Sequence, residues 1–183
     1  GGAGFIGSNI VDELVAMGHQ VRVVDNFITG KREHLENVAD EIELLEGDIR
    51  DLEFMKKAAK GMEYVLHQAA LRSVPKSVDN PLLTNDININ GTLNTLLAAK
   101  EAGVKMFVYA SSSSCYGDAQ RFPEKEDDLP KPISPYAVSK LTGEYYCKTF
   151  SVTLNLPTVS LRYFNVFGPR QSPESKYSTV IPL

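Results

Sequence analysis

Several features that narrow the choice of function are scarce in this sequence of 183 residues. Its two cysteines, Cys115 and Cys147, lack the spacing of a metal site or a disulfide framework, which fits a reducing cytoplasm. The net charge is −4 and no basic run is present, so nucleic acid is not expected as a partner. The longest apolar stretches fall far short of the roughly 20 residues of a membrane span. With 43% hydrophobic and 23% charged residues, the composition is that of a soluble globular chain with one sizeable core.

Short apolar runs alternate with helical patterns along the chain. Strands are expected at 20–25, 42–46, 64–67, 105–110 and 158–163, and helices at 52–60, at 83–102 and from Pro135 onward. Asp51 and Ser134 can cap two of these helices, and Gly103 can end the third. Strands that alternate with helices predict an α/β fold, a doubly wound parallel sheet with helices on both faces.

The sequence begins with glycines at positions 1, 4 and 7, followed by apolar residues at helical spacing. Such glycines let a backbone turn tightly and approach a pyrophosphate, which the N-terminus of the next helix attracts. Asp25 ends the following expected strand, where a carboxylate accepts hydrogen bonds from an adenosine ribose. Because this carboxylate would repel a 2′-phosphate, NAD is expected rather than NADP, although Lys31 and Arg32 lie close by in sequence.

Tyr136 and Lys140 are four residues apart on an expected helix and would share one of its faces. A lysine cation beside a tyrosine favours the phenolate, which makes Tyr136 a candidate base at neutral pH. The serine cluster at 111–114 follows an expected strand, and one of its hydroxyls can bond the same substrate oxygen. These groups can take a proton from an alcohol while another group removes the hydride.

Together these elements resemble the extended short-chain dehydrogenase/reductase superfamily over essentially the whole chain. The motifs that carry the resemblance are Gly1/Gly4/Gly7, Asp25-Asn26-Phe27, Gly47-Asp48-Ile49, His67-Gln68-Ala69-Ala70, Asn90-Gly91-Thr92, Ser111 to Gly117, Tyr136/Lys140 and Leu161-Arg162-Tyr163-Phe164-Asn165. Within the superfamily, the sequence is most similar to nucleotide-sugar 4-epimerases of the UDP-glucose and UDP-N-acetylglucosamine type. Residues 162–171, with Tyr177 and 180–182 behind them, and residues 72–75 look particularly like the UDP-N-acetylhexosamine enzymes.

The resemblance implies a Rossmann-like NAD-binding domain over residues 1–183, with the start of a substrate-binding region at 160–183. A buried strand normally precedes the glycine loop of such a domain, so the chain is expected to lack its first strand. It is also expected to lack the C-terminal lobe that closes over the nucleotide sugar, and to be destabilised and inactive when isolated. Similar proteins often dimerise through two helices, here about 83–102 and 137–150, so a homodimer is expected.

The resemblance also implies roles for individual residues. The expected catalytic residues are Ser112, Tyr136 and Lys140, and no metal is expected. Contacts with NAD are expected from Gly1, Gly4, Phe5, Ile6, Gly7, Asp25, Asn26, Phe27, Thr29, Gly30, Asp48, Ile49, Gln68, Ala69, Ala70, Arg72, Asn88, Ser111, Tyr136, Lys140, Tyr163 and Phe164. Contacts with a UDP-sugar are expected from Arg72, Ser73, Val74, Ser112, Ser113, Ser114, Tyr136 and Asn165.

Three residues have competing interpretations. Asn88 either hydrogen-bonds a main-chain carbonyl beside the cofactor or faces water. Arg170 either binds phosphate or covers a surface. His67 is expected to be a core or backbone-bonding histidine rather than a catalyst, because no carboxylate or serine partner is near it in sequence.

The serines at 113 and 114 bear on the type of reaction. Related 4,6-dehydratases carry an Asp-Glu pair at these positions, and UDP-glucuronate decarboxylases usually show a glutamate where Ser114 stands. Without these carboxylates, the resemblance implies NAD-dependent 4-epimerisation of a UDP-hexose through a transient 4-keto intermediate. The alternatives are a UDP-glucuronate 4-epimerase or decarboxylase and a non-catalytic NAD-binding sensor, which would need neither Tyr136 nor Lys140.

Overall fold

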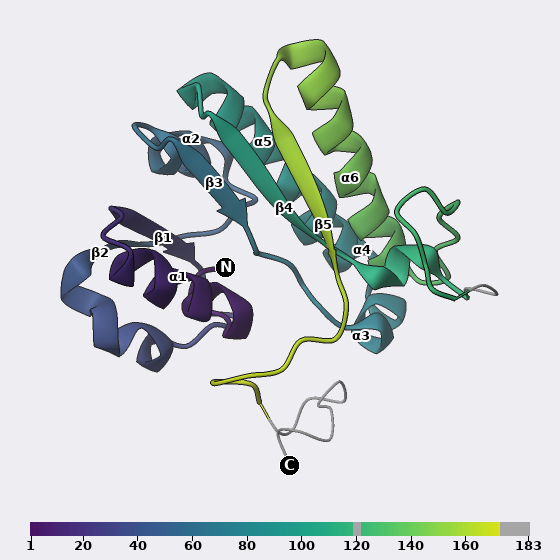
Figure 1. The fold of residues 1–183 in the computed structure, drawn as a ribbon, viewed down its shortest axis with the longest axis horizontal. Helices are drawn as coiled ribbons and strands as arrows, with labels where there is room; N and C mark the ends of the chain where they lie inside the picture. The colour runs from purple at the N-terminus through teal and green to yellow at the C-terminus, as the bar shows by residue number, and fades with distance from the viewer. Residues whose placement is uncertain (119–121, 173–183) are drawn as a thin grey trace. The chain divides into compact units, whose positions relative to one another are not determined.

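The computed structural model describes residues 1–118 and 122–172, which form two compact units (Figure 1). Unit 1 comprises Gly1–Asp48 and Asn165–Leu183, and unit 2 comprises Ile49–Phe164. Both contain parallel strands and helices, so the expected α/β class is confirmed. Residues 173–183 of the expected substrate-binding region, including Tyr177, lie outside the described residues.

Unit 1 is built on a parallel pair of strands, β1 (Val21–Asp25) and β2 (Ile42–Glu46). The other elements of this unit are α1 (Phe5–Ala16) and the 3₁₀ helix η1 (Arg32–Glu41). The apolar side chains that they bury together are Ala3, Val11, Val23, Leu35 and Val38. The strand predictions are confirmed, whereas η1 was not predicted because its sequence is largely charged and polar.

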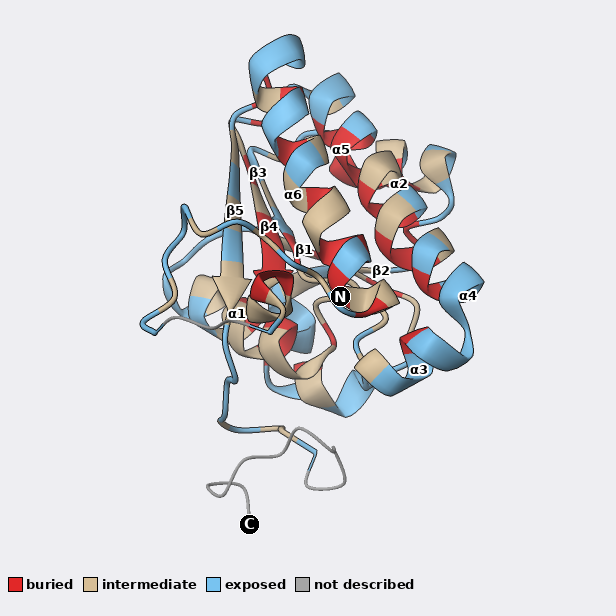
Figure 2. Cartoon of the chain, turned by 90° about the vertical axis from the view of Figure 1, so that its right-hand side faces the viewer, coloured by how far each residue is buried: buried red, intermediate tan, exposed pale blue. Residues whose placement is uncertain are grey.

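Unit 2 contains a parallel sheet of β3 (Tyr64–His67), β4 (Met106–Ser112) and β5 (Thr158–Tyr163), in that order. Helices α5 (Gly91–Ala102) and α6 (Pro135–Leu154) lie alongside it (Figure 1). The core between sheet and helices includes Leu96, Phe107, Tyr109, Cys147, Phe150 and Leu156. Buried residues accordingly line β4 and the inner faces of both helices in Figure 2.

The face of this sheet turned away from α6 carries apolar side chains in contact with solvent. Side chains alternate along a strand, so Tyr64, Leu66, Val159 and Leu161 point away from the helices. They are between 40% and 59% exposed.

The expected helix ends of unit 2 are confirmed. Asp51 caps α2 (Leu52–Ala59) by accepting from the Phe54 N–H, and Ser134 caps α6 by accepting from the Ala137 N–H. The helix expected at 83–102 is made of α4 (Pro81–Asn85), a π-helical turn η2 (Asp86–Asn90) and α5, and it ends at Gly103. The π turn and the short helices α3 (Val74–Asp79) and η3 (Ser113–Tyr116) were not predicted.

Three further properties concern residues 1–118 and 122–172. No helix in these ranges is long and apolar enough to cross a bilayer. The same ranges contain no group of three histidine, cysteine or carboxylate side chains that could hold a metal ion. Cys115 and Cys147 are buried free thiols.

Candidate active site

In unit 1, the glycine loop leads directly into α1. Gly4 is the N-cap residue and offers no side-chain cap, so the N–H groups of the first helical turn keep their hydrogen-bonding capacity. A Cβ on Gly7 would collide with the carbonyl oxygen of Gly1 and lie 2.8 Å from the Cα of Gly2. Glycine at this position therefore lets the helix start against its own loop. The predicted cofactor contacts in this turn are Phe5, Ile6 and Gly7, and their backbone donors fit a pyrophosphate.

Asp25, the last residue of β1, is fixed against the glycine loop. Its Oδ2 accepts the Ala3 N–H at 2.9 Å, and its Oδ1 accepts the Phe27 N–H at 2.9 Å. A Cβ on Gly30 would lie 2.8 and 2.9 Å from the two carboxylate oxygens. The carboxylate is only 6% exposed, but each oxygen has a further lone pair, so the group fits the hydroxyls of a ribose.

The remaining residues predicted in this region follow the two strands. Asn26 donates from Nδ2 to Asp48 Oδ2 at 2.9 Å, which links the ends of β1 and β2. Thr29 is exposed. Lys31 pairs with Glu33 at 3.0 Å, and Arg32 pairs with Glu46 and lies 4.2 Å from the Phe27 ring centroid. Both cations near Asp25 in sequence thus have partners within unit 1.

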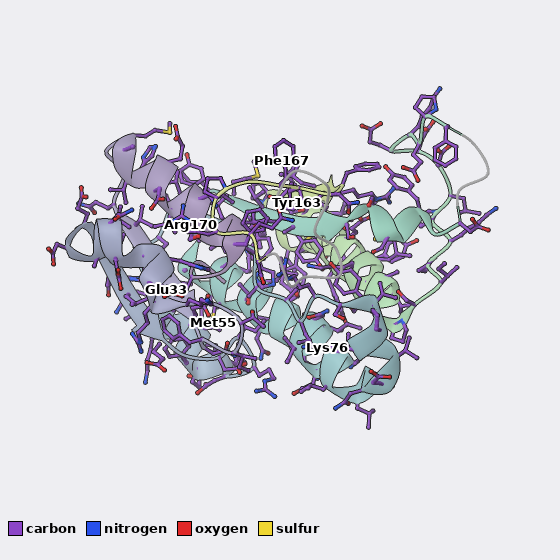
Figure 3. All side chains as sticks on the ribbon, turned by 90° about the horizontal axis from the view of Figure 1, so that it is seen from below. Glu33, Met55, Lys76, Tyr163, Phe167 and Arg170 are labelled. Carbon is purple, nitrogen blue, oxygen red and sulfur yellow. The ribbon has the colours of Figure 1, made fainter. Side chains whose placement is uncertain are left out.

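Arg170, labelled in Figure 3, is fastened to unit 1 rather than left on an open surface. It donates from Nη2 to Asp12 Oδ2 at 2.5 Å and from Nη1 to the His34 carbonyl oxygen at 2.7 Å. Asn9 also donates to the Pro169 carbonyl oxygen at 3.0 Å. These bonds attach the segment that follows Asn165, an exposed residue, to α1 and η1. To bind a phosphate, the Arg170 guanidinium would therefore have to share its donors with Asp12 and the His34 carbonyl.

In unit 2, Tyr136 and Lys140 lie on successive turns at the start of α6. The half-buried Tyr136 donates its backbone N–H to Ser77 Oγ at 3.1 Å. Lys140 is only 4% exposed, and its ammonium donates to the Ala110 carbonyl oxygen at 2.7 Å. The ammonium lies 6.0 Å from the centroid of the Tyr136 ring. Burial lowers the pKa of Lys140 to about 8, so most molecules still carry this charge at neutral pH.

The serines at the end of β4 have different partners: Ser111 bonds Glu144, whereas Ser112 bonds Ser114. Ser112 Oγ accepts the Ser114 N–H at 3.2 Å and the Ser114 hydroxyl at 2.9 Å, which caps η3. Ser112 therefore uses its acceptor capacity locally and keeps its own O–H as a donor. Ser111 is buried and donates to Glu144. Ser113 and Ser114 are half-buried in η3.

Glu144 and Arg162 form a partly buried ion pair behind these residues. Arg162 donates from Nε and Nη2 to the two carboxylate oxygens at 2.9 and 2.8 Å. Burial raises the pKa of Glu144, but hydrogen bonds from Arg162 and Ser111 outweigh this effect and hold its pKa below the usual value. The guanidinium also lies 4.5 Å from the ring centroid of Tyr116.

Asn88 and His67 are both internal to unit 2. Asn88, in the π turn, accepts the Leu71 N–H at 2.7 Å and donates to the Leu71 carbonyl at 3.2 Å and to Ser139 Oγ at 3.0 Å. It thus bonds a main-chain carbonyl, as one of its two interpretations predicted. His67 bonds Thr92 Oγ1 at 2.9 Å. Burial and the nearby Lys140 charge lower its pKa to about 3, so it is neutral and belongs to the core as expected.

The loop after β3 contains several of the other predicted residues. Gln68 donates to the Tyr163 hydroxyl at 3.3 Å, and Ala69 and Ala70 are half-buried. Ser73 caps α3, in which Val74 is the first residue, and Arg72 is exposed. Phe164 is 57% exposed and contacts the Tyr116 ring at a centroid distance of 6.2 Å. The Ile49 side chain is buried in the core, where Gly91 leaves space for it.

The structure thus gathers the predicted residues into two sets. In unit 1 these are the glycine loop, Asp25, Gly30, Asn26 and Asp48, and in unit 2 they are the ends of β3, β4 and β5 with the first turns of α6. Glu144 was missed. A signal for it was present, because Tyr136, Lys140 and Glu144 follow at intervals of four along one helical face.

A glycine loop that opens a helix, with a carboxylate ending the next strand, is typical of dinucleotide-binding α/β proteins. The sequence matches the NAD dependent epimerase/dehydratase family over residues 1–183. The chain therefore belongs to this family, as the motif resemblance predicted.

Named relatives support the same family. UDP-N-acetylglucosamine 4-epimerase from Methanobrevibacter ruminantium, solved with UDP-N-acetylmuramic acid, has a TM-score of 0.93 and 43% identity, covering 99% of this chain and 58% of its own. UDP-glucose 4-epimerase from Thermus thermophilus, solved with NAD, has a TM-score of 0.90 and 42% identity. The match covers 97% of this chain and 57% of the Thermus chain. UDP-glucose 4-epimerase from Mycolicibacterium smegmatis is 38% identical over 184 residues, covering 98% and 59%. The chain thus spans less than two thirds of the length of these relatives.

Proposed function

We propose that the whole protein is an NAD-dependent isomerase that inverts C4 of a UDP-hexose through a transient 4-keto sugar. The observation that carries this proposal is the position of the Lys140 ammonium. It lies 6.0 Å from the Tyr136 ring and is bonded to Ala110, two residues before Ser112. The similarity to UDP-glucose and UDP-N-acetylglucosamine 4-epimerases supports the same reaction.

In this proposal Tyr136 is the base. Its phenolate takes the proton from the 4-hydroxyl of the sugar and returns it after the sugar has turned. The cation of Lys140 stabilises the phenolate, and it does so strongly because it is buried where water screens it little. The hydrogen bond to Ala110 holds the ammonium in place for this role.

Ser112 orients the reacting oxygen. Because its acceptor capacity is directed at Ser114, its remaining O–H can donate to O4 of the sugar. Such a donor stabilises negative charge on O4 when the proton leaves. Ser113 and Ser114 provide no carboxylate for removing a proton from carbon, which favours epimerisation over dehydration.

The cofactor expected from the family fits the residues of unit 1. The first turn of α1 would receive the pyrophosphate of NAD, and Asp25 would receive the adenosine ribose. When bound, NAD would accept hydride from C4 and return it to the opposite face. We further assign the cofactor contacts of unit 2 to Gln68, Ala69, Ala70, Arg72, Tyr163 and Phe164, and those of the UDP-sugar to Arg72, Ser73, Val74 and Asn165.

The biological setting belongs to the same proposal. We place the whole protein in the cytoplasm, where the two buried cysteines stay reduced. We also propose a homodimer formed through α5 and α6, because apolar residues such as Val138 and Val152 of α6 are 47% and 73% exposed.

The test is to incubate the whole protein with UDP-galactose, UDP-N-acetylgalactosamine and UDP-glucuronate in parallel and to determine the stereochemistry of the products. The proposal predicts inversion at C4 of one or both neutral sugars. Release of carbon dioxide or formation of UDP-xylose from UDP-glucuronate would instead identify a decarboxylase, and inversion of UDP-glucuronate alone a glucuronate epimerase. Retention of NAD without turnover of any of these sugars would indicate a sensor.

A further inference from the structure

One carboxylate in unit 2 joins three elements, two of which carry proposed catalytic residues. Glu144 on α6 accepts hydrogen bonds from Ser111 Oγ on β4 and from Nε and Nη2 of Arg162 on β5. Glu144 follows Lys140 by one helical turn, and Ser111 directly precedes Ser112. The carboxylate therefore ties the helix of the base to the strand of the serine.

The strand register explains why these groups meet. Ser111 and Arg162 are paired residues of β4 and β5, so their side chains leave the same face of the sheet. That face is the one covered by α6 (Figure 1). A single carboxylate from α6 can therefore receive donors from both strands, and this fixes the height of the helix along them.

The network also reaches the turn that follows Ser112. The Arg162 guanidinium lies 4.5 Å from the ring centroid of Tyr116, the last residue of η3. Ser112 caps that same turn. The Glu144–Arg162 pair therefore lies against the last residue of the turn that Ser112 caps.

The Glu144–Arg162 pair is largely shielded from water, and this shielding costs free energy. The side chains of Glu144 and Arg162 are only 14% and 15% exposed. A pair of apolar residues of similar size often stabilises a fold as well as a buried ion pair does, because charges lose hydration when they are buried. Stability alone therefore does not account for an ion pair here. Directional hydrogen bonds to two strands fix the position of α6 relative to β4 and β5, which apolar contacts would do less precisely.

We propose that Glu144, held by Arg162, is a positioning residue that sets the distance between the Ser112 hydroxyl and the Tyr136–Lys140 pair. This inference rests on the proposed function and adds a residue to it. Glu144 acts through Ser111 and through α6, and it contacts neither sugar nor cofactor.

The test uses the whole protein with a double substitution, Glu144→Leu with Arg162→Met, which removes both charges together and retains apolar volume. The thermal midpoint and the bound NAD are expected to stay close to those of the parent protein. Because misplacing catalytic groups by about 1 Å can cost about a hundredfold in rate, kcat per NAD-loaded molecule should fall by about ten- to a hundredfold, with KM for the sugar nucleotide little changed. The matched control is Lys148→Gln, one turn further along α6 on its exposed side, which should keep the parent kcat.

Two milder variants cover the case in which the double variant does not fold. Glu144→Gln replaces one acceptor oxygen by an amide donor, and Ser111→Ala removes one bond while the ion pair remains. Each should lower kcat more than it raises KM, with the smaller loss for Ser111→Ala. Parent-like kcat in any of the three folded variants would overturn the positioning role. If the parent protein itself shows no turnover in this assay, the proposed function is rejected. The same assay therefore separates failure of the proposed function from failure of the positioning role.

Discussion

Unit 1 contains a buried carboxylate and unit 2 a partly buried one, each near a proposed functional group, and the two are held in different ways. Asp25 in unit 1 is fixed by backbone N–H groups of Ala3 and Phe27, next to glycines that allow a close approach. Glu144 in unit 2 is fixed by the side chains of Ser111 and Arg162. Backbone groups thus hold the Asp25 carboxylate in unit 1. In unit 2, side chains from distant parts of the sequence hold the Glu144 carboxylate.

The difference matches the functions proposed for the two units. Binding a pyrophosphate and a ribose needs backbone donors and one carboxylate, which a glycine loop and a strand end supply. Transferring a proton needs several side chains at defined distances, which requires a rigid support. Substitutions should therefore separate cofactor retention in unit 1 from turnover in unit 2.

The largest expected effect comes from Tyr136→Phe in the whole protein. Without the phenolic oxygen, kcat should fall by about 10²- to 10⁴-fold, because the base that accepts the sugar proton is lost. Bound NAD should stay at the parent level, since its main contacts are proposed in unit 1. Turnover and NAD content are measured on the same sample, and unchanged turnover would remove Tyr136 from the mechanism.

The second prediction compares ion pairs of the two units. Arg162→Met leaves Glu144 charged and largely shielded from water without its partner, so the free energy of unfolding should fall by up to about 3–5 kcal/mol. Arg32→Met breaks the pair with Glu46, in which both side chains are 60% exposed, and should cost about 1 kcal/mol or less. Urea unfolding of both variants gives the two values, and equal losses would show that burial does not distinguish the pairs.

The third prediction concerns Lys140 and alkaline pH. Its pKa is about 8 in the folded chain, below the value of about 10.4 for an unperturbed lysine, so the unfolded chain binds more protons between these values. The penalty for burying the charge is fully present below pH 8 and is relieved as the pH rises towards 10.4. The parent should gain up to about 3 kcal/mol relative to Lys140→Met across this window.

The control for this experiment is Lys148→Met, which removes an exposed lysine from the same helix. Its stability difference from the parent should change little between pH 8 and 10.4. If Lys140→Met and Lys148→Met behave alike, Lys140 is not buried as a cation.

The smallest expected effect concerns His67 and acid. Its pKa of about 3 lies below the unperturbed value of about 6.5, so stability present above pH 6.5 is lost as the pH falls through this range. Between pH 6.5 and 5, the parent should lose about 2 kcal/mol relative to His67→Gln, which cannot take up a proton. Urea unfolding at both pH values measures the loss, with the exposed His19→Gln as control. Equal pH dependence of His67→Gln and the parent would contradict a buried neutral imidazole.

Sequence patterns predicted local structure well where it depends on neighbouring residues. The strands, the caps by Asp51 and Ser134 and the helix end at Gly103 agree with the structure, because periodicity and capping are short-range properties. The charged η1 segment and the π turn at Asp86–Asn90 were missed. Both are held by tertiary contacts, such as the bonds from Asn88 to Leu71 and Ser139, which no local pattern reveals.

The candidate site shows the same limit. Tyr136, Lys140 and Asp25 could be selected because spacing and position on an element mark them. The partners of Glu144 lie 33 and 18 residues away in sequence, so their convergence depends on the register of β4 and β5. Likewise, the pairing of Arg170 with Asp12 joins residues 158 positions apart, and sequence alone left its role between two possibilities.

The most direct test follows deuterium at C4. UDP-galactose labelled with deuterium at this carbon is incubated with the whole protein in ordinary water, and the product is examined by mass spectrometry and NMR. Because Tyr136 is proposed to handle only the proton on O4, the epimerised product should retain the deuterium at C4. Product that has exchanged this deuterium for solvent hydrogen would show that the carbon itself loses a proton, and would contradict the proposed chemistry.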